Sequence, residues 1–161
     1  MAGRRDFLLA AGALAMAAGS AEAETLPPLP PVAPRHHIRF AVCGISHDHV
    51  HGMIGAIQRG GGELVAWWGA EPDKRAVFLR RYPNAKAARS QDEILQDSGI
   101  QLVLSSHIAS ERAGIGVRAM RAGKDFLADK PGITTLEDLA LVRKTIAETG
   151  RKFAILYSER L

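Results

Sequence analysis

Three histidines at alternate positions and one Asp-Lys-Pro tripeptide carry side chains that can do chemistry. The histidines are His47, His49 and His51, and the tripeptide is Asp129-Lys130-Pro131. Imidazole nitrogens can bind a metal ion, hydrogen-bond a phosphate or exchange a proton near neutral pH. A lysine held beside a carboxylate can position a substrate hydroxyl or assist a proton transfer. Both groups are therefore candidates for a functional site.

The histidines can form a metal site only if the fold supplies further ligands. On a helix, His47 and His51 would lie one turn apart and could share an ion. A zinc or iron site would also need His107 or Asp129 from the ends of other strands, and would suit a metal-dependent hydrolase. Two alternatives remain open. The histidines can hydrogen-bond a phosphate or substrate at a helix N-terminus, or they can form a polar first turn without special duty.

The histidines follow a glycine that joins an expected strand to an expected helix. Residues 38–43 form a short apolar run typical of a buried strand. The run stops at Gly44, which can turn sharply and lets a ligand approach the backbone. Val50, Ile54 and Ile57 then recur at helical spacing. A strand, a glycine turn and a helix open a dinucleotide-binding domain, in which the helix N-terminus faces a phosphate.

Strand-like and helix-like segments alternate after this unit. Further strands are expected at 63–68, 85–88, 101–106, 125–128 and 152–157. Helices are expected at 72–81, 90–97, 110–122 and 134–150. The alternation predicts an α/β fold, a Rossmann-type doubly wound parallel sheet of about six strands. Ligands of such sheets bind beyond the carboxyl ends of the strands, so the candidate site residues lie there.

Two capping boxes mark the starts of expected helices. They are Ser90-Gln91-Asp92-Glu93 and Thr134-Thr135-Leu136-Glu137. The second opens a helix whose spacing predicts an apolar face made of Leu136, Leu139, Ala140 and Ile146.

Composition narrows the class of protein. The chain has 161 residues, a one-domain length, and a hydrophobic share of 47% that is enough for a core. Its net charge of +4 is spread along the sequence without a basic run, so a nucleic-acid partner is not expected. The single cysteine, Cys43, excludes an internal disulfide and is expected to be a small buried hydrophobe.

The N-terminal residues are expected to lie outside the folded domain. Residues 1–23 resemble a signal peptide of the twin-arginine type, with Arg4-Arg5 before an apolar run and Ala21-Glu22-Ala23 at the cleavage site. Residues 24–36 are rich in proline and predict a linker, or an arm that lies on a partner subunit. The protein is therefore expected to be exported, to the periplasm for example, and can form a homo-oligomer. Residues 37–161 are expected to form the domain.

The order of the segments from Ile38 to about Leu161 resembles the N-terminal domain of the glucose-fructose oxidoreductase, inositol dehydrogenase and MocA family (Gfo/Idh/MocA). The residues that carry the resemblance are 39–44, 62–66, 101–104, 119–124 and 129–132. The resemblance implies a Rossmann domain that binds NAD or NADP, followed by an α/β domain that acts on hydroxyls of sugars, inositols and similar polyols. Some exported members also carry a twin-arginine signal and a proline-rich arm.

The resemblance also assigns roles residue by residue. A Glu-Lys-Pro motif of the family supplies a lysine near the nicotinamide and the substrate, so Lys130 inherits that role and Asp129 replaces the glutamate. The family's glycine pattern aligns with Gly44, Ser46 and His49, of which only the first is glycine. Its Thr-Pro after the fourth strand aligns with His107 and Ile108, and its downstream histidine aligns with Arg112.

The acidic residue that would hold the ribose falls near Ala70, and Glu71, one position later, can substitute for it. The expected catalytic residue is Lys130, and no metal ligand is assigned. The expected cofactor-binding residues are Gly44, Ile45, Ser46, His47, His49, Glu71, Ser106, His107, Asp129, Lys130 and Pro131.

Family members continue into a substrate domain where this chain ends. The sequence therefore predicts the NAD(P)-binding domain of an exported oxidoreductase that acts on sugar- or polyol-type hydroxyls, and this chain alone is expected to be inactive. The lost glycines favour an alternative, a non-catalytic Rossmann-like binding module or a truncated remnant. A metal-dependent hydrolase that uses His47, His49 and His51 is a third hypothesis.

Overall fold

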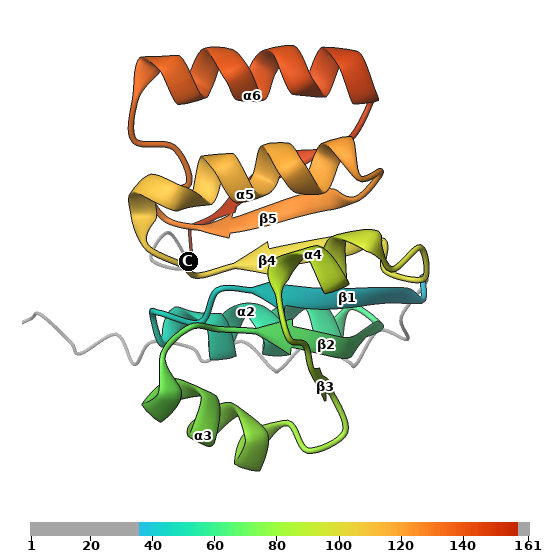
Figure 1. Ribbon diagram of the computed structural model, residues 1–161. Helices are drawn as coiled ribbons and strands as arrows, with labels where there is room; N and C mark the ends of the chain where they lie inside the picture. Colours follow the sequence, from blue (N-terminus) through green and yellow to red (C-terminus); the bar gives the residue numbers. More distant parts are fainter. Residues whose placement is uncertain (1–35, 158–161) are drawn as a thin grey trace, which may run out of the picture. The chain divides into compact units, whose positions relative to one another are not determined.

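The computed structural model describes residues 36–157 (Figure 1). The expected signal peptide and all but the last residue of the proline-rich segment lie outside the described residues. None of the described helices has the length and apolar character needed to cross a membrane.

Strands and helices alternate along the described residues. The strands are β1 (Ile38–Cys43), β2 (Gly62–Trp68), β3 (Lys86–Ala87), β4 (Leu102–Ser105), β5 (Asp125–Asp129) and β6 (Phe153–Leu156). The helices are α2 (His49–Arg59), α3 (Pro72–Arg81), α4 (Gln91–Gln96), α5 (Ala109–Arg121) and α6 (Leu136–Thr149). The strands form one sheet in the order β3-β2-β1-β4-β5-β6, and every pair is parallel. The predicted doubly wound fold is confirmed.

Helices cover both faces of this sheet. The chain leaves β1 toward β2 and β3 and later returns to β4, from which it continues in the opposite direction to β5 and β6. Because each crossover between parallel strands is right-handed, this reversal places α2 and α3 on one face and α5 on the other. The helix α4 shares the second face with α5, and α6 packs on α5 (Figure 1).

The central strand β1 is buried on both faces. Phe40 and Val42 pack in the cluster under α2 and α3, whereas Ala41 and Cys43 pack under α4 and α5. The alternation follows from the two-residue period of a strand. Burial raises the pKa of the Cys43 thiol to about 12, so this cysteine is a buried apolar residue, as predicted.

The N-cap of the first expected capping box is present, although the Glu93 carboxylate accepts from the Arg89 N–H rather than from that of Ser90, and the second box is displaced. The Ser90 hydroxyl accepts a hydrogen bond from the Glu93 N–H at 3.2 Å. At α6, however, the N-cap is Thr135, whose hydroxyl accepts from the Asp138 N–H at 3.0 Å. The box expected from Thr134 to Glu137 is therefore wrong by one residue, because Thr135 is still extended and the helix begins at Leu136.

The apolar face expected for α6 is also wrong. Val142 and Thr145 are its buried residues, whereas Leu136 is 79% exposed and Ile146 is exposed as well. The reason is that α6 packs against α5 rather than directly on the sheet, so Val142 meets a narrow surface of Ala113, Val117 and Met120. A contact between two helices buries a narrower stripe than a contact with a sheet.

Candidate functional site

Backbone hydrogen bonds join the loops that follow β1, β2 and β4 at the carboxyl edge of the sheet. The Gly44 N–H donates to the Trp68 carbonyl at 2.8 Å, and the Ser106 N–H donates to the Gly44 carbonyl at 3.1 Å. The His47 N–H in turn donates to the Ser106 carbonyl at 3.0 Å. The order of the strands reverses between β1 and β4, and ligands of open parallel sheets bind at such a point. The candidate side chains gather at this edge.

Gly44 is required by the backbone of the first turn. Its φ is +97°, a conformation that residues with a side chain rarely adopt. A Cβ at this position would also collide with the buried side chain of His107. The turn leads into α2, whose N-cap residue Asp48 makes no side-chain capping bond. The N–H groups and the positive dipole end of α2 therefore face the carboxyl edge, as at a phosphate site.

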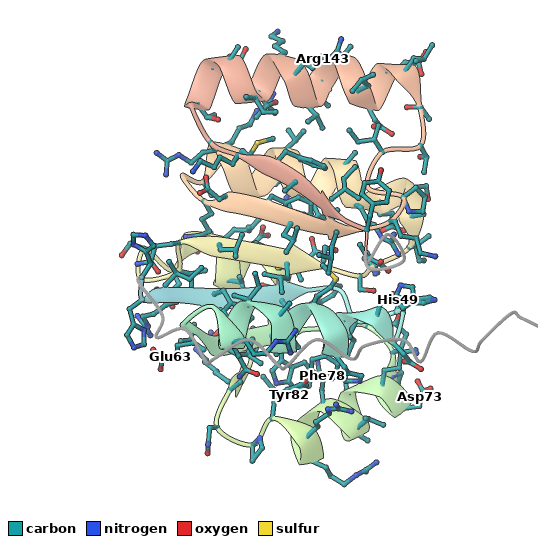
Figure 2. The ribbon with its side chains drawn as sticks, turned by 180° about the vertical axis from the view of Figure 1, so that it is seen from behind. His49, Glu63, Asp73, Phe78, Tyr82 and Arg143 are labelled. Carbon is teal, nitrogen blue, oxygen red and sulfur yellow. The ribbon has the colours of Figure 1, made fainter. Side chains whose placement is uncertain are left out.

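Figure 2 shows how the helix ends are arranged around the sheet. His49, the first residue of α2, and Asp73, in the first turn of α3, lie at the same end of the sheet. Glu63, near the start of β2, lies at the opposite end. The beginnings of α2 and α3 thus both border the candidate site.

One polar cluster at this edge joins Ser46, Glu71 and His107. The Ser46 hydroxyl donates to Oε1 of Glu71 at 2.5 Å, and Nδ1 of His107 lies 2.8 Å from the same hydroxyl oxygen. Because a hydroxyl has one proton, His107 Nδ1 must be the donor when Ser46 donates to Glu71. Nε2 of His107 lies 3.0 Å from Glu111. The cluster therefore links the ends of β1, β2 and β4.

Glu71 keeps one carboxylate oxygen free. Burial alone would raise its pKa, but the Ser46 hydroxyl and backbone N–H groups hold the pKa below the ordinary value, so the group is a carboxylate at neutral pH. Its Oε2 is buried and has no hydrogen-bond partner among the described residues. An acceptor of this kind at the end of the second strand suits a sugar hydroxyl.

A second cluster is centred on Asp129, which is 3% exposed and is the last residue of β5. The sequence predicted that this strand ends at residue 128. In the structure Asp129 still belongs to the strand and pairs with Leu156 of β6. Oδ1 accepts from the Lys130 N–H at 2.8 Å and lies 3.1 Å from Nδ1 of His49. Oδ2 accepts from the Ser106 hydroxyl at 3.1 Å.

Arg112 holds the turn after β5 in place, and sequence reasoning did not include it among the site residues. Its Nε donates to the His107 carbonyl at 2.7 Å, and its Nη1 donates to the carbonyls of Asp129, Lys130 and Pro131 at 3.1, 2.7 and 3.1 Å. Its Nη2 lies 3.4 Å from Oδ2 of Asp129. Burial lowers the pKa of the guanidinium, and Asp129 opposes that shift. The only signal in the sequence was the alignment of Arg112 with a histidine of the family.

The structure does not support a pairing of His47 with His51, which the sequence left open as one alternative. Because α2 begins only at His49, His47 precedes the helix and is not one helical turn from His51. Nδ1 of His51 lies 2.9 Å from the Tyr82 hydroxyl, and its ring stacks on Phe78 of α3. Burial lowers the pKa of His51. A metal site that uses all three histidines is therefore excluded by this geometry.

Three predicted site residues remain to be placed, namely Lys130, Pro131 and Ile45. Lys130 and Pro131 follow Asp129 directly, and a cis peptide bond joins them. Ile45 is 1% exposed and packs against Gly69, and it also lines a cavity of about 420 Å³ with Asp48 and Lys74. The structure thus brings together the polar candidates from four strand ends and places Ile45 behind them.

The parallel sheet, the glycine turn at the reversal of strand order and the acidic residue after β2 define a Rossmann-type dinucleotide-binding fold. No protein-family model matches the chain. A 1,5-anhydro-D-fructose reductase of Ensifer adhaerens is 30% identical over 112 residues, which are 70% of this chain and 34% of the relative.

Solved structures agree with this match. A candidate oxidoreductase of Erwinia carotovora atroseptica SCRI1043 is 39% identical, with a TM-score of 0.74 over 76% of this chain and 37% of that protein. The WlbA dehydrogenase of Chromobacterium violaceum, solved with NADH and UDP-GlcNAcA, is 20% identical, with a TM-score of 0.67 over 80% of this chain and 37% of its own. The chain spans about a third of the length of these relatives.

These relatives confirm the resemblance drawn from the sequence. The solved neighbours are Gfo/Idh/MocA-type oxidoreductases, and the chain is similar to the N-terminal portion of each.

Proposed function

We propose that this chain is the NAD(P)-binding domain of an exported oxidoreductase that acts on hydroxyls of sugar- or polyol-type substrates. The observation that carries the proposal is the turn at Gly44, where a positive φ delivers the N-terminus and the positive dipole end of α2 to the point at which strand order reverses. The His49 N–H donates to Nδ1 of His47 at 3.3 Å, so the His47 ring would have to turn away before that N–H could bind a phosphate. Oriented N–H groups at that place suit the diphosphate of a dinucleotide.

The side chains around the turn suit a dinucleotide, except that Ser46 narrows the space for its diphosphate. The free Oε2 of Glu71 is the acceptor for a ribose hydroxyl, and its negative charge would oppose a 2′-phosphate, which favours NAD over NADP. Ser46 is the restriction, because its side chain occupies the place where the family has a glycine that lets the diphosphate approach. A bound NAD(P) would supply hydride transfer, and Lys130 would hold or protonate the substrate oxygen.

Relatives support the substrate class. One curated relative is a reductase of a sugar derivative, and one structural neighbour was solved with a nucleotide sugar. The twin-arginine pattern at Arg4-Arg5 supports export, and the proline-rich residues 24–36 support an arm that contacts a second copy of the chain.

A fluorescence titration tests the proposal. NADH and NADPH are added to the purified full chain, and energy transfer from Trp67 and Trp68 to the reduced nicotinamide is followed. We expect saturable binding of NADH and weaker binding of NADPH. The absence of binding by either cofactor at millimolar concentration would contradict the proposal.

The second candidate is a Rossmann-like module that no longer binds a dinucleotide. The short hydrogen bond between Ser46 and Glu71 favours this candidate, because it engages the carboxylate that a ribose would need. The two candidates make opposite predictions in the same titration.

A further inference from the structure

We propose that His47, His49 and Asp129 bind a divalent transition-metal ion beside the carboxyl ends of β1 and β5. Each residue offers one ligand atom, and these atoms all lie within 4.8 Å of one another. This grouping differs from the one that the sequence suggested, since it omits His51 and adds the carboxylate from β5. The proposal does not rest on the proposed cofactor, although its three residues are also expected cofactor-binding residues.

The distances between ligand atoms suit a small ion. For bonds of about 2.0–2.2 Å in tetrahedral geometry, neighbouring ligand atoms should be about 3.3–3.6 Å apart. Nδ1 of His49 lies 3.1 Å from Oδ1 of Asp129, and Nδ1 of His47 lies 3.7 Å from Oδ2. The two values refer to different oxygens of Asp129, and the three ligand atoms lie within 4.8 Å of one another, so the side chains would have to rotate toward one another to bind an ion.

The ligand set selects the class of ion. Two imidazoles with one carboxylate suit zinc, cobalt, nickel or ferrous iron, whereas magnesium and calcium prefer sites made of oxygen ligands only. Three protein ligands leave at least one coordination position open. The side chain of His47 is 55% exposed, so solvent can reach the site.

Neighbouring groups fix the carboxylate, which distinguishes the site from an exposed acidic patch. The side chain of Asp129 is 4% exposed, and the Ser106 hydroxyl and the Lys130 N–H orient its two oxygens. Such hydrogen bonds to a ligating carboxylate are typical of metal centres. Nη2 of Arg112 lies 3.4 Å from Oδ2 and brings a positive charge that opposes the ion. The hydrogen bonds of its Nη1, however, go to three carbonyl oxygens.

An ion at this position would join the loop between β1 and α2 to the turn that carries Lys130. In the structure this connection consists of the hydrogen bond between His49 and Asp129 and of the Ser106 hydroxyl, which lies 2.9 Å from the His47 carbonyl and 3.1 Å from Oδ2 of Asp129. Metal binding should therefore stabilise the folded chain against heat, because a ligand that prefers the native state raises the free energy of unfolding.

The test measures metal binding directly and needs no cofactor. Cobalt(II) is titrated into the full chain and followed by its visible absorption, and zinc(II) binding is measured by calorimetry. His36 and His37 are adjacent and exposed, so both are replaced by glutamine in the parent to remove an adventitious site. We expect one ion per chain. His47→Gln and His49→Gln should each weaken binding at least tenfold, and His51→Gln should not.

Several results would overturn the proposal. One is that no ion binds in a stoichiometric amount. Another is that binding disappears when only His36 and His37 are replaced. A third is that His47→Gln and His49→Gln both bind the ion with unchanged affinity. Circular dichroism of each variant shows whether it is folded. His47→Gln is the safest variant in this respect because the side chain is exposed. Zinc should also raise the midpoint of thermal unfolding of the parent more than that of either variant.

Discussion

The hydroxyl of Ser46 lies 2.5 Å from Oε1 of Glu71, and this contact joins the first turn of the domain to the end of its second strand. In the family pattern a glycine stands at the position of Ser46. Here the serine side chain holds the acidic residue that a ribose would use, while Oε2 of that residue stays buried without a partner. If a dinucleotide binds as proposed, its ribose would compete with Ser46 for this carboxylate.

Ser46→Gly should strengthen dinucleotide binding by about tenfold, which corresponds to about 1.4 kcal/mol. The substitution frees Glu71 and removes the side chain beside the expected diphosphate. NADH titration of parent and variant measures the change. Ser46→Ala is the matched control, because it removes the hydroxyl and keeps the Cβ, and it should give an intermediate gain. An equal or weaker affinity of Ser46→Gly would show that the serine does not restrict the site.

Gly44→Ala should lower the free energy of unfolding by more than about 2 kcal/mol, because left-handed backbone alone costs roughly 1–2 kcal/mol for a residue with a Cβ and the new Cβ meets His107. Urea unfolding measures the loss. Gly52→Ala is the control, since Gly52 lies inside α2 with open space around it. It should be neutral or stabilising by up to about 1 kcal/mol. Equal effects of the two substitutions would contradict the role given to Gly44.

Arg112→Met should destabilise the fold by about 3–5 kcal/mol, because it leaves the buried carboxylate of Asp129 without its charged partner. It also removes the donor for the carbonyls of the turn that carries Lys130. Arg118→Met is the control on the same helix, where the arginine pairs with Asp92 at the surface. That variant should lose less than about 1 kcal/mol. Chemical unfolding of both variants decides the matter, and a small loss for Arg112→Met would be inconsistent with this role.

Glu93 should make stability depend on pH in acid. Its pKa falls from 4.5 to about 2 in the folded chain, because Lys86 hydrogen-bonds the carboxylate and Arg89 adds further donors. Since the folded pKa lies below the unfolded value, this stabilisation is present above pH 4.5 and is lost as the pH falls toward 2.

Thermal unfolding of the parent and of Glu93→Gln between pH 7 and pH 2 measures the effect. The variant should melt at a lower temperature at pH 7, and the difference should disappear toward about pH 2. Glu63→Gln is the control, because its ion pair with Arg39 is exposed and 3.8 Å long, so it should change the melting temperature less at pH 7. A difference that persists unchanged at pH 2 would rule out the mechanism.

The sequence predicted most of the fold because its strands are buried and separated by helices with clear ends. Pro72 marked the start of α3, and Ser90 marked the start of α4, as observed. The buried face of α6 could not be predicted from the sequence. Its sequence has several apolar residues at helical spacing, and only the contact with α5 selects Val142 over Leu136.

The site was predictable at the level of strand ends but not of side-chain partners. Gly44 and Glu71 lie where the fold rule places them, because their positions depend on local turns. The pairing of His49 with Asp129 joins residues that are 80 apart in sequence. In the sequence, His47 and His51 are four residues apart, and this spacing suggested that these two histidines could share an ion. Arg112 was missed because its role depends on carbonyls of a distant turn.

Nuclear magnetic resonance of the isotopically labelled full chain locates dinucleotide binding most directly. NADH is added, and the shifts of the backbone amide signals are followed. We predict saturable changes at Gly44, Ser46, His49 and Glu71. We predict none at Gly61, which directly precedes β2, or at Gly62, its first residue, because both lie at the opposite end of the strands. An absence of changes at saturating NADH, or changes confined to residues away from the turn after β1, would contradict dinucleotide binding at this site.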